Sequence, residues 1–239
     1  MSHTGVRALL FVALAISVMI QAATPAKATT YAAMAPLAQY LTPARSEEID
    51  LARTAAVPAI SSKATILVLT SHGYETAQTG SNGFTCLVER AWVKSFDDDQ
   101  FWNASVRTPV CYNAEASQTV LRYTQFRTGL ALAGASQRTI REKVQTAVAN
   151  KQLPPVAPGS MAYMTSKAQY IDDHVKAWYP HIMFYAPKND GADSGRDWGA
   201  DRKGSPVVYD SGHLINPEPW SLFFVPVAHW SDGTMGPSM

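Results

Sequence analysis

The order of apolar and polar positions along the chain predicts several buried strands. Residues 64–70 form an apolar run rich in β-branched side chains, which is typical of a buried strand, and turn-forming residues follow it. One face of residues 84–92 is apolar except at Arg90, which indicates a second strand. Four more apolar runs of strand length occur in the last third, at residues 161–164, 181–185, 206–209 and 221–228.

Three earlier stretches have the periodicity and the capping residues of helices. The first starts at residues 42–48, where acidic side chains suit the first turn, and it ends before Pro58. The second follows a capping residue, Asn113, and stops at Gly134. The third starts after Ser136 and carries apolar side chains at the i, i+4, i+7 and i+8 spacing of one helix face.

Helices are therefore expected in the first two thirds of the chain and strands mostly in the last third. This segregation predicts an α+β fold rather than a doubly wound parallel sheet. We expect an antiparallel or mixed sheet of about five to six strands, with about three helices packed on one face. The chain has 239 residues, which is enough to bury a substantial core within one domain.

The N-terminus has the pattern of a cleavable signal peptide. A short basic start precedes an uncharged apolar run at residues 8–20, which is shorter than the roughly 20 residues that a membrane-spanning helix needs. Small side chains at Ala26 and Ala28 suit cleavage by a signal peptidase, and a buried N-terminal helix is the alternative. No later segment has the length and apolarity of a membrane span. The predicted division is a signal peptide at residues 1–28, a poorly ordered lead-in at residues 29–41 and one α+β domain at residues 42–239.

Charge and cysteine content limit the classes of function. The chain has 20 Lys and Arg residues and 19 Asp and Glu residues, and two of the basic residues lie within residues 1–28. The remainder therefore has 18 basic and 19 acidic residues, which gives a net charge of −1. This balance offers no clustered basic surface for nucleic acid and no support for binding at a membrane surface. Export to the periplasm or the extracellular space also predicts a disulfide bond between the only two cysteines, Cys86 and Cys111.

Histidines near the ends of two predicted strands form the first candidate site. His181 opens one strand and His229 follows another, so antiparallel pairing of these strands would bring the two imidazoles together. Asp232 could then orient an imidazole by accepting its ring N–H, which predicts a catalytic cluster. His174 would add a third imidazole and allow a divalent metal such as zinc to bind. The alternative is that these histidines are hydrogen-bonded structural groups.

A second candidate site follows the buried strand at residues 64–70. His72 and Glu75 could act there as base and acid, with Arg90 binding an anionic group and with Trp230 as a further binding residue. The alternative is that His72 caps a turn and that Arg90 pairs with Glu89 or Glu75.

Four segments carry a resemblance to other proteins: HGYETAQTGSNGFTCLVERAW, MAYMTSK, PHIMFYAP and FFVPVAHWSDGT. They are similar to a group of exported bacterial proteins of unassigned function, and the likeness covers most of residues 60–235. The resemblance implies export and a single domain. It implies no activity, cofactor or catalytic residue.

Two classes of function follow. The chain lacks the Gly-x-Ser-x-Gly, His-Glu-x-x-His, P-loop and Gly-x-Gly-x-x-Gly motifs, which removes the enzyme classes that these motifs identify. The favoured hypothesis is an envelope protein that binds a small molecule or a partner in an aromatic cleft containing His181, His229, Trp230 and the loop at residues 188–204. The alternative is a hydrolase-like or metal-assisted enzyme that uses His181, His229 and Asp232. No cofactor is implied beyond the divalent metal of that alternative.

Overall fold

A computed structural model describes residue 1 and residues 31–188, 207–209 and 217–237. The strands in this part of the chain are β1 (Thr65–Thr70), β2 (Gly73–Gln78), β3 (Thr85–Glu89), β4 (Thr108–Tyr112), β5 (Met161–Met164), β6 (His181–Pro187), β7 (Val207–Tyr209) and β8 (Trp220–Pro226). The helices are α1 (Arg45–Arg53), α2 (Pro58–Ser61), α3 (Ala114–Gln118), α4 (Val120–Leu132) and α5 (Gln137–Ala149), with short 3₁₀ turns η1 (Leu37–Gln39) and η2 (Ala91–Val93).

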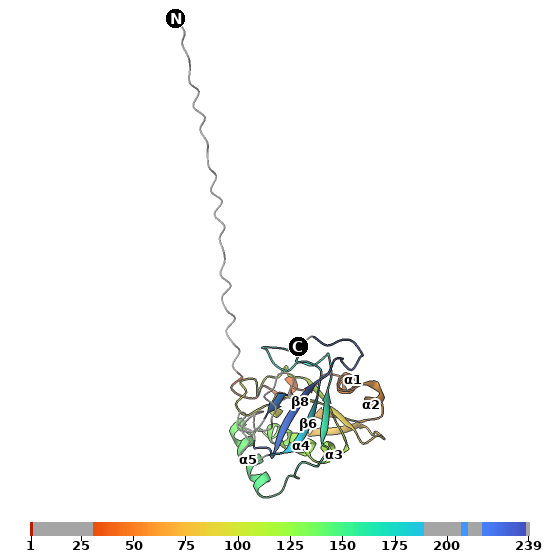
Figure 1. Cartoon of the computed structure of the whole chain (residues 1–239). Coiled ribbons are helices and arrows are strands. Elements are labelled where there is room, and N and C mark those ends of the chain that lie inside the picture. The colour runs from red at the N-terminus through yellow and green to blue at the C-terminus, as the bar shows by residue number, and fades with distance from the viewer. Residues whose placement is uncertain (2–30, 189–206, 210–216, 238–239) are drawn as a thin grey trace.

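The strands form one mixed sheet in the order β2-β1-β3-β4-β5-β6-β8-β7. Strands β6 and β8 lie side by side in it (Figure 1). Only the β1–β3 pair is parallel among the strand pairs that the structure describes, and the other pairs are antiparallel. The predicted α+β fold with a mixed sheet is therefore confirmed. The sheet has eight described strands where about five to six were expected, because β2 and β4 were not recognised in the sequence.

Helices cover both faces of the sheet, whereas the sequence suggested that they pack on only one face. Ile66 of β1 packs in a cluster with Ala52 of α1, while its neighbour Leu67 packs in a cluster with Leu121 of α4. Successive side chains of a strand point to opposite faces, so α1 and α4 lie on opposite sides of β1. The order of elements along the chain could not reveal this, because it does not say on which face each helix returns.

Two of the three predicted helix caps are present, whereas α1 begins after Ala44 without a side-chain cap. The Asn113 side chain accepts a hydrogen bond from the backbone N–H of Ala116, and that of Ser136 accepts one from Thr139. The single helix expected after Asn113 is divided into α3 and α4 at Thr119, whose φ and ψ of −119° and −73° depart from helical values.

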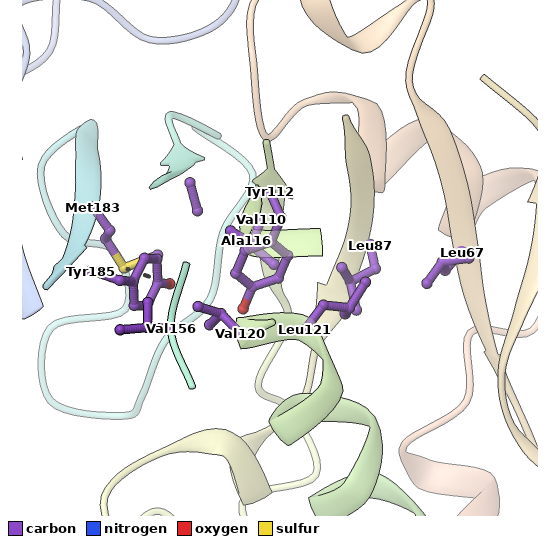
Figure 2. Close-up of a cluster of buried hydrophobic side chains, with 11 residues drawn as sticks. Leu67, Leu87, Val110, Tyr112, Ala116, Val120, Leu121, Val156, Met183 and Tyr185 are labelled. Atoms are coloured by element: carbon purple, nitrogen blue, oxygen red, sulfur yellow. Dashed lines mark hydrogen bonds between the residues drawn. The ribbon is translucent and has the colours of Figure 1, made fainter. Parts of the chain in front are cut away.

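The main core lies between the sheet and α3 and α4. Figure 2 shows Leu67, Leu87 and Val110, from three adjacent strands, facing Val120 and Leu121 at the start of α4. A second core on the opposite face contains the cysteines. Cys86 and Cys111 are directly opposite each other in the β3–β4 register and form the predicted disulfide.

The described part of the lead-in packs against the domain, although its sequence suggested little order. Tyr40 is fully buried, and its hydroxyl donates to the carbonyl oxygen of Trp102 at 2.7 Å. The Tyr31 hydroxyl donates to Asp173 at 2.8 Å. The predicted signal peptide, residues 1–28, lies outside the described residues apart from Met1. None of the helices described here is both long and apolar enough to cross a membrane.

Candidate functional site: an aromatic cavity with buried charged groups

A cavity of about 520 Å³ lies on the face of the sheet that carries the main core. Its floor comes from alternate residues of two paired strands: His181, Met183 and Tyr185 of β6, and Leu222 and Phe224 of β8. The period of two explains why one face of each strand reaches the cavity while the intervening residues do not. The wall opposite comes from α4.

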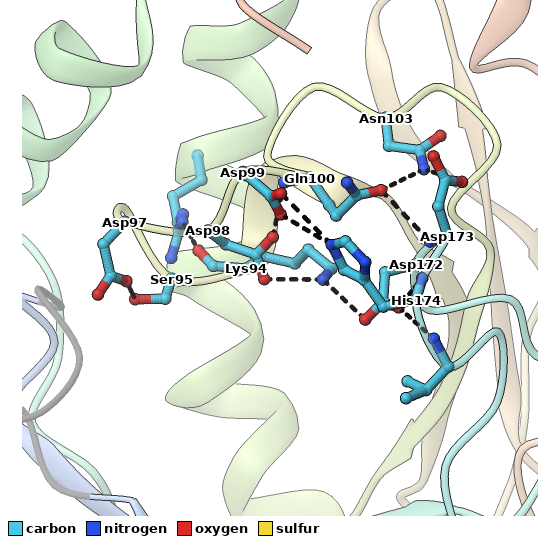
Figure 3. A network of polar contacts seen from close by, with 12 residues as sticks. Lys94, Ser95, Asp97, Asp98, Asp99, Gln100, Asn103, Asp172, Asp173 and His174 are labelled. Atoms are coloured by element: carbon cyan, nitrogen blue, oxygen red, sulfur yellow. Dashed lines mark hydrogen bonds and ion pairs between the residues drawn. The ribbon is translucent and has the colours of Figure 1, made fainter. Parts of the chain in front are cut away.

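The segment that connects β5 to β6 forms another wall of the cavity through Gln169, Ile171, Asp172, Val175 and Trp178. Polar contacts tie this segment to the loop at residues 94–103 (Figure 3). The contacts include the Lys94–Asp172 ion pair at 3.6 Å, the hydrogen bond from Asn103 to Asp173 at 3.0 Å and the His174–Asp99 pair at 3.3 Å.

Hydroxyl groups from two elements hold the Asp173 carboxylate in place. Tyr170 donates to it at 2.6 Å and Tyr31 at 2.8 Å, and these hydrogen bonds lower the pKa of Asp173 because they stabilise its charged form. The contacts of Asp173, which does not line the cavity, thus help to fix the connecting segment beside it.

Glu89 places a buried carboxyl group in the cavity wall. Its side chain is only 7% exposed, and its Oε1 accepts hydrogen bonds from the hydroxyls of Tyr112 at 2.7 Å and Thr124 at 2.8 Å. Oε2 makes no hydrogen bond with another described residue. Burial raises the pKa of Glu89, because removing the carboxylate from water outweighs the two hydrogen bonds that favour its charged form.

A buried ion pair lies in the same wall. Arg127 of α4 donates to Glu218 at 2.9 Å and to the carbonyl oxygen of Lys94 at 2.5 Å. Its guanidinium group lies 4.1 Å from the centroid of the Phe96 ring, within the range of a cation–π contact. Burial lowers the pKa of Arg127, and the neighbouring Glu218 opposes this effect.

His181 is held as one neutral tautomer. Its Nδ1 lies 2.7 Å from the carbonyl oxygen of Tyr179, which can only accept, so Nδ1 carries the proton and Nε2 has a free lone pair. The ring is 2% exposed and packs against Trp178 and Phe224, with centroids 4.7 and 5.2 Å away. Burial lowers the pKa of His181 to about 4. Its Nε2 has no hydrogen-bond partner among the described residues.

The structure does not bring together the three residues of the first candidate site. Strands β6 and β8 pair antiparallel as expected, with His181 opposite Pro226. His229 is nevertheless exposed, beyond the end of β8, and Asp232 accepts hydrogen bonds from the backbone N–H and the hydroxyl of Thr234. No hydrogen bond or ion pair is described between any two of His181, His229 and Asp232.

Of the second candidate site, only His72 and Glu75 lie near each other, since both are hydrogen-bonded to the Thr70 hydroxyl. His72 and Glu75 are exposed at the β1–β2 turn, where the Thr70 hydroxyl donates to Glu75. Arg90 is fully buried and donates to Glu48 at 2.8 Å, so it pairs with a glutamate of α1 rather than presenting its charge to an anion. Trp230 is buried but does not line the cavity described here.

The third metal-ligand candidate, His174, pairs with Asp99 near the surface. Within the described ranges, no group of three His, Cys, Asp or Glu side chains is placed to hold a metal ion.

Glu89, Arg127 and Glu218 line the cavity but were not predicted from the sequence. A signal was present for the first of them, because an ionisable residue within a run that is otherwise apolar and strand-forming is buried together with its strand. Arg127 and Glu218 are 91 positions apart, and nothing local in the sequence indicates that they pair.

The fold and the cavity define a class: a mixed-sheet α+β protein with an aromatic cavity whose lining includes buried carboxyl groups. Comparisons of the chain with protein-family models, with curated proteins and with solved structures find no match.

Proposed function

We propose that this chain is an exported protein that binds a small, largely apolar molecule in the cavity between β6, β8 and α4. The observation that carries the proposal is the cavity itself. Its volume of about 520 Å³ falls within the roughly 300–1,000 Å³ typical of small-molecule sites. Its lining is mainly aromatic and aliphatic, with a few polar groups, which is the usual composition of such sites.

Polar atoms of the lining that lack hydrogen-bond partners support the proposal that the cavity binds a ligand and is not merely a packing defect of the fold. A buried polar atom without a partner costs stability, on the order of 1–3 kcal/mol. His181 Nε2 and Gln169 Oε1 are buried atoms of this kind on residues that line the cavity. A ligand that hydrogen-bonds to them would remove part of that cost.

Two features support export: the N-terminal pattern of a basic start, an apolar run and small residues, and the Cys86–Cys111 disulfide, which suits an oxidising compartment. The resemblance to exported proteins points the same way. The alternative function, an enzyme that uses His181 with His229 and Asp232, has weaker support because Asp232 is engaged with Thr234 and His229 is exposed.

A fluorescent probe can test the proposed function. N-phenyl-1-naphthylamine is apolar and fluoresces when it leaves water, so we expect saturable binding to the purified protein. Replacing Met164, which lines the cavity, with Trp should fill part of the space and weaken binding by about tenfold, the effect of losing about 1.4 kcal/mol of contacts.

The matched control is Met161→Trp on the same strand, because Met161 does not line the cavity. Circular dichroism would verify that both variants fold. Equal affinity in both variants, or no saturable binding to the unmodified protein, would show that this cavity is not the binding site.

A further inference from the structure

The charged groups that line the cavity do not balance. Arg127 pairs with Glu218 at 2.9 Å, and Lys94 pairs with Asp172 at 3.6 Å, so each of these cations already has a carboxylate partner. Glu89 is the remaining carboxyl group of the lining, and no ion pair joins it to a cation in the described part of the chain. The cavity wall therefore contains one carboxyl group without a counter-ion.

The unpaired polar atoms of the lining are mostly hydrogen-bond acceptors. His181 Nε2 is an acceptor because Nδ1 carries the proton, and Gln169 Oε1 is an acceptor because the amide nitrogen donates to two carbonyl oxygens, at 2.9 and 3.0 Å. Glu218 Oε2 is an acceptor as well. Among the buried lining atoms that lack a partner in the described part of the chain, Arg127 Nε is the one donor. A ligand rich in donors would complement this wall.

The surroundings of Glu89 suit a cation. Tyr112 and Thr124 both donate to Oε1 and fix the carboxyl group, so Oε2 is the atom left for a ligand. Tyr112, which donates to Glu89, belongs to a row of aromatic rings in the lining: the centroids of Tyr112 and Tyr185 are 6.4 Å apart, and those of Tyr185 and Trp220 are 5.8 Å apart. The faces of such rings attract cations. An ammonium group offers three donors and a positive charge, whereas a carboxylate ligand would be repelled.

We infer that the ligand of this cavity is an amine with an apolar body, whose ammonium group pairs with Oε2 of Glu89 while the body packs against the aromatic and aliphatic lining. This inference rests on the proposed function and names its ligand class. The binding step is non-covalent, and Glu89 acts as the counter-ion.

A series of three molecules with the same body tests the inference: 4-phenylbutylamine, 4-phenylbutanol and 4-phenylbutyrate, each titrated into the full chain by calorimetry at neutral pH. We expect the amine to bind about tenfold more tightly than the alcohol, as a charge-assisted hydrogen bond implies, and the carboxylate to bind most weakly. Glu89→Gln retains an acceptor for Tyr112 and Thr124 but removes the charge, so it should abolish the advantage of the amine and leave the alcohol unaffected.

The matched control is Glu75→Gln, which removes an exposed carboxylate away from the cavity and should leave all three affinities unchanged. If the alcohol binds as tightly as the amine, or if Glu89→Gln leaves the amine affinity intact, the ammonium inference is wrong while binding in the cavity stands. Tightest binding of the carboxylate would overturn the inference in the same way. If none of the three molecules binds and the naphthylamine probe also fails, both the inference and the proposed function are wrong.

Discussion

Burial of His181 should make the stability of the protein depend on pH. Its imidazole has a pKa near 6.5 when exposed and about 4 in the folded protein, because burial disfavours the charged ring. Between these two pH values the unfolded chain binds more protons than the folded one. Protonation therefore favours unfolding, and the stability that neutral His181 allows above pH 6.5 is lost as the pH falls toward 4.

The magnitude follows from the two pKa values. One pKa unit corresponds to about 1.36 kcal/mol, so the complete effect is about 3 kcal/mol, of which about 2.5 kcal/mol develops between pH 7.5 and pH 4.5. This is a large fraction of the stability of about 5–15 kcal/mol that is typical of a folded domain.

Urea unfolding of the unmodified protein and of His181→Gln at both pH values provides the measurement. Carboxyl groups titrate in both proteins, so the informative quantity is the difference between their losses of unfolding free energy. The unmodified protein should lose about 2.5 kcal/mol more than His181→Gln. Because the variant also removes packing, the His181 ring should be titrated by NMR in the unmodified protein, where we expect a midpoint near pH 4. Equal losses in the two proteins, or a ring that titrates near 6.5, would refute the reasoning.

Two further predictions concern stability. Glu89→Gln should make the protein more stable at neutral pH, because burial raises the pKa of Glu89 and so disfavours its charged form; the gain should shrink as the pH falls and Glu89 becomes neutral, and calorimetric melting against the exposed control Glu75→Gln measures it. Replacing Cys86 and Cys111 together with Ala should lower the unfolding free energy by about 3.5 kcal/mol, the entropy model's value for a closed loop of this length, and urea unfolding that is unchanged from the disulfide-bonded protein would contradict it.

Local patterns in the sequence predicted the parts of the site that depend on local structure. The apolar run at residues 181–185 predicted a strand that starts at His181, and this strand is present as β6. Its alternate residues His181, Met183 and Tyr185 share the cavity floor. The sequence did not predict β2, because this edge strand has polar or exposed residues on both faces, as at Glu75 and Thr76, and so shows no apolar alternation.

The charged residues of the site depend on contacts between distant parts of the chain, and this is why they could not be predicted. Arg90 is adjacent to Glu89 in sequence, yet the two side chains belong to different surroundings. Arg90 pairs with Glu48, 42 positions away, while Glu89 faces Thr124 of α4 and the cavity. Adjacent residues of a strand point to opposite sides of the sheet, so Glu89 and Arg90 lie on different sides. Only the packing of α1 on one side and α4 on the other decides which of the two side chains finds a partner of opposite charge.

The two buried arginines show how a structural ion pair differs from one at a site. In Arg90 the Nε donates to Tyr40, one terminal nitrogen donates to Val88 and the other to both oxygens of Glu48, so every nitrogen has a partner. In the Arg127–Glu218 pair, Arg127 Nε and Glu218 Oε2 have no partner within the described residues.

Folding favours the first arrangement, since each unpaired buried polar atom costs stability. The second arrangement lies beside Glu89 in the cavity wall, and Glu89 also has an oxygen without a hydrogen bond. Four of the seven buried side-chain atoms without a partner among the described residues belong to the cavity lining, and the other three, Arg53 Nε, Arg141 Nε and Ser221 Oγ, lie elsewhere. The Arg127–Glu218 pair at the cavity is thus incomplete, whereas the Arg90–Glu48 pair away from it is complete. This contrast is the physical argument that the cavity is arranged for a ligand and that the ligand supplies hydrogen-bond donors.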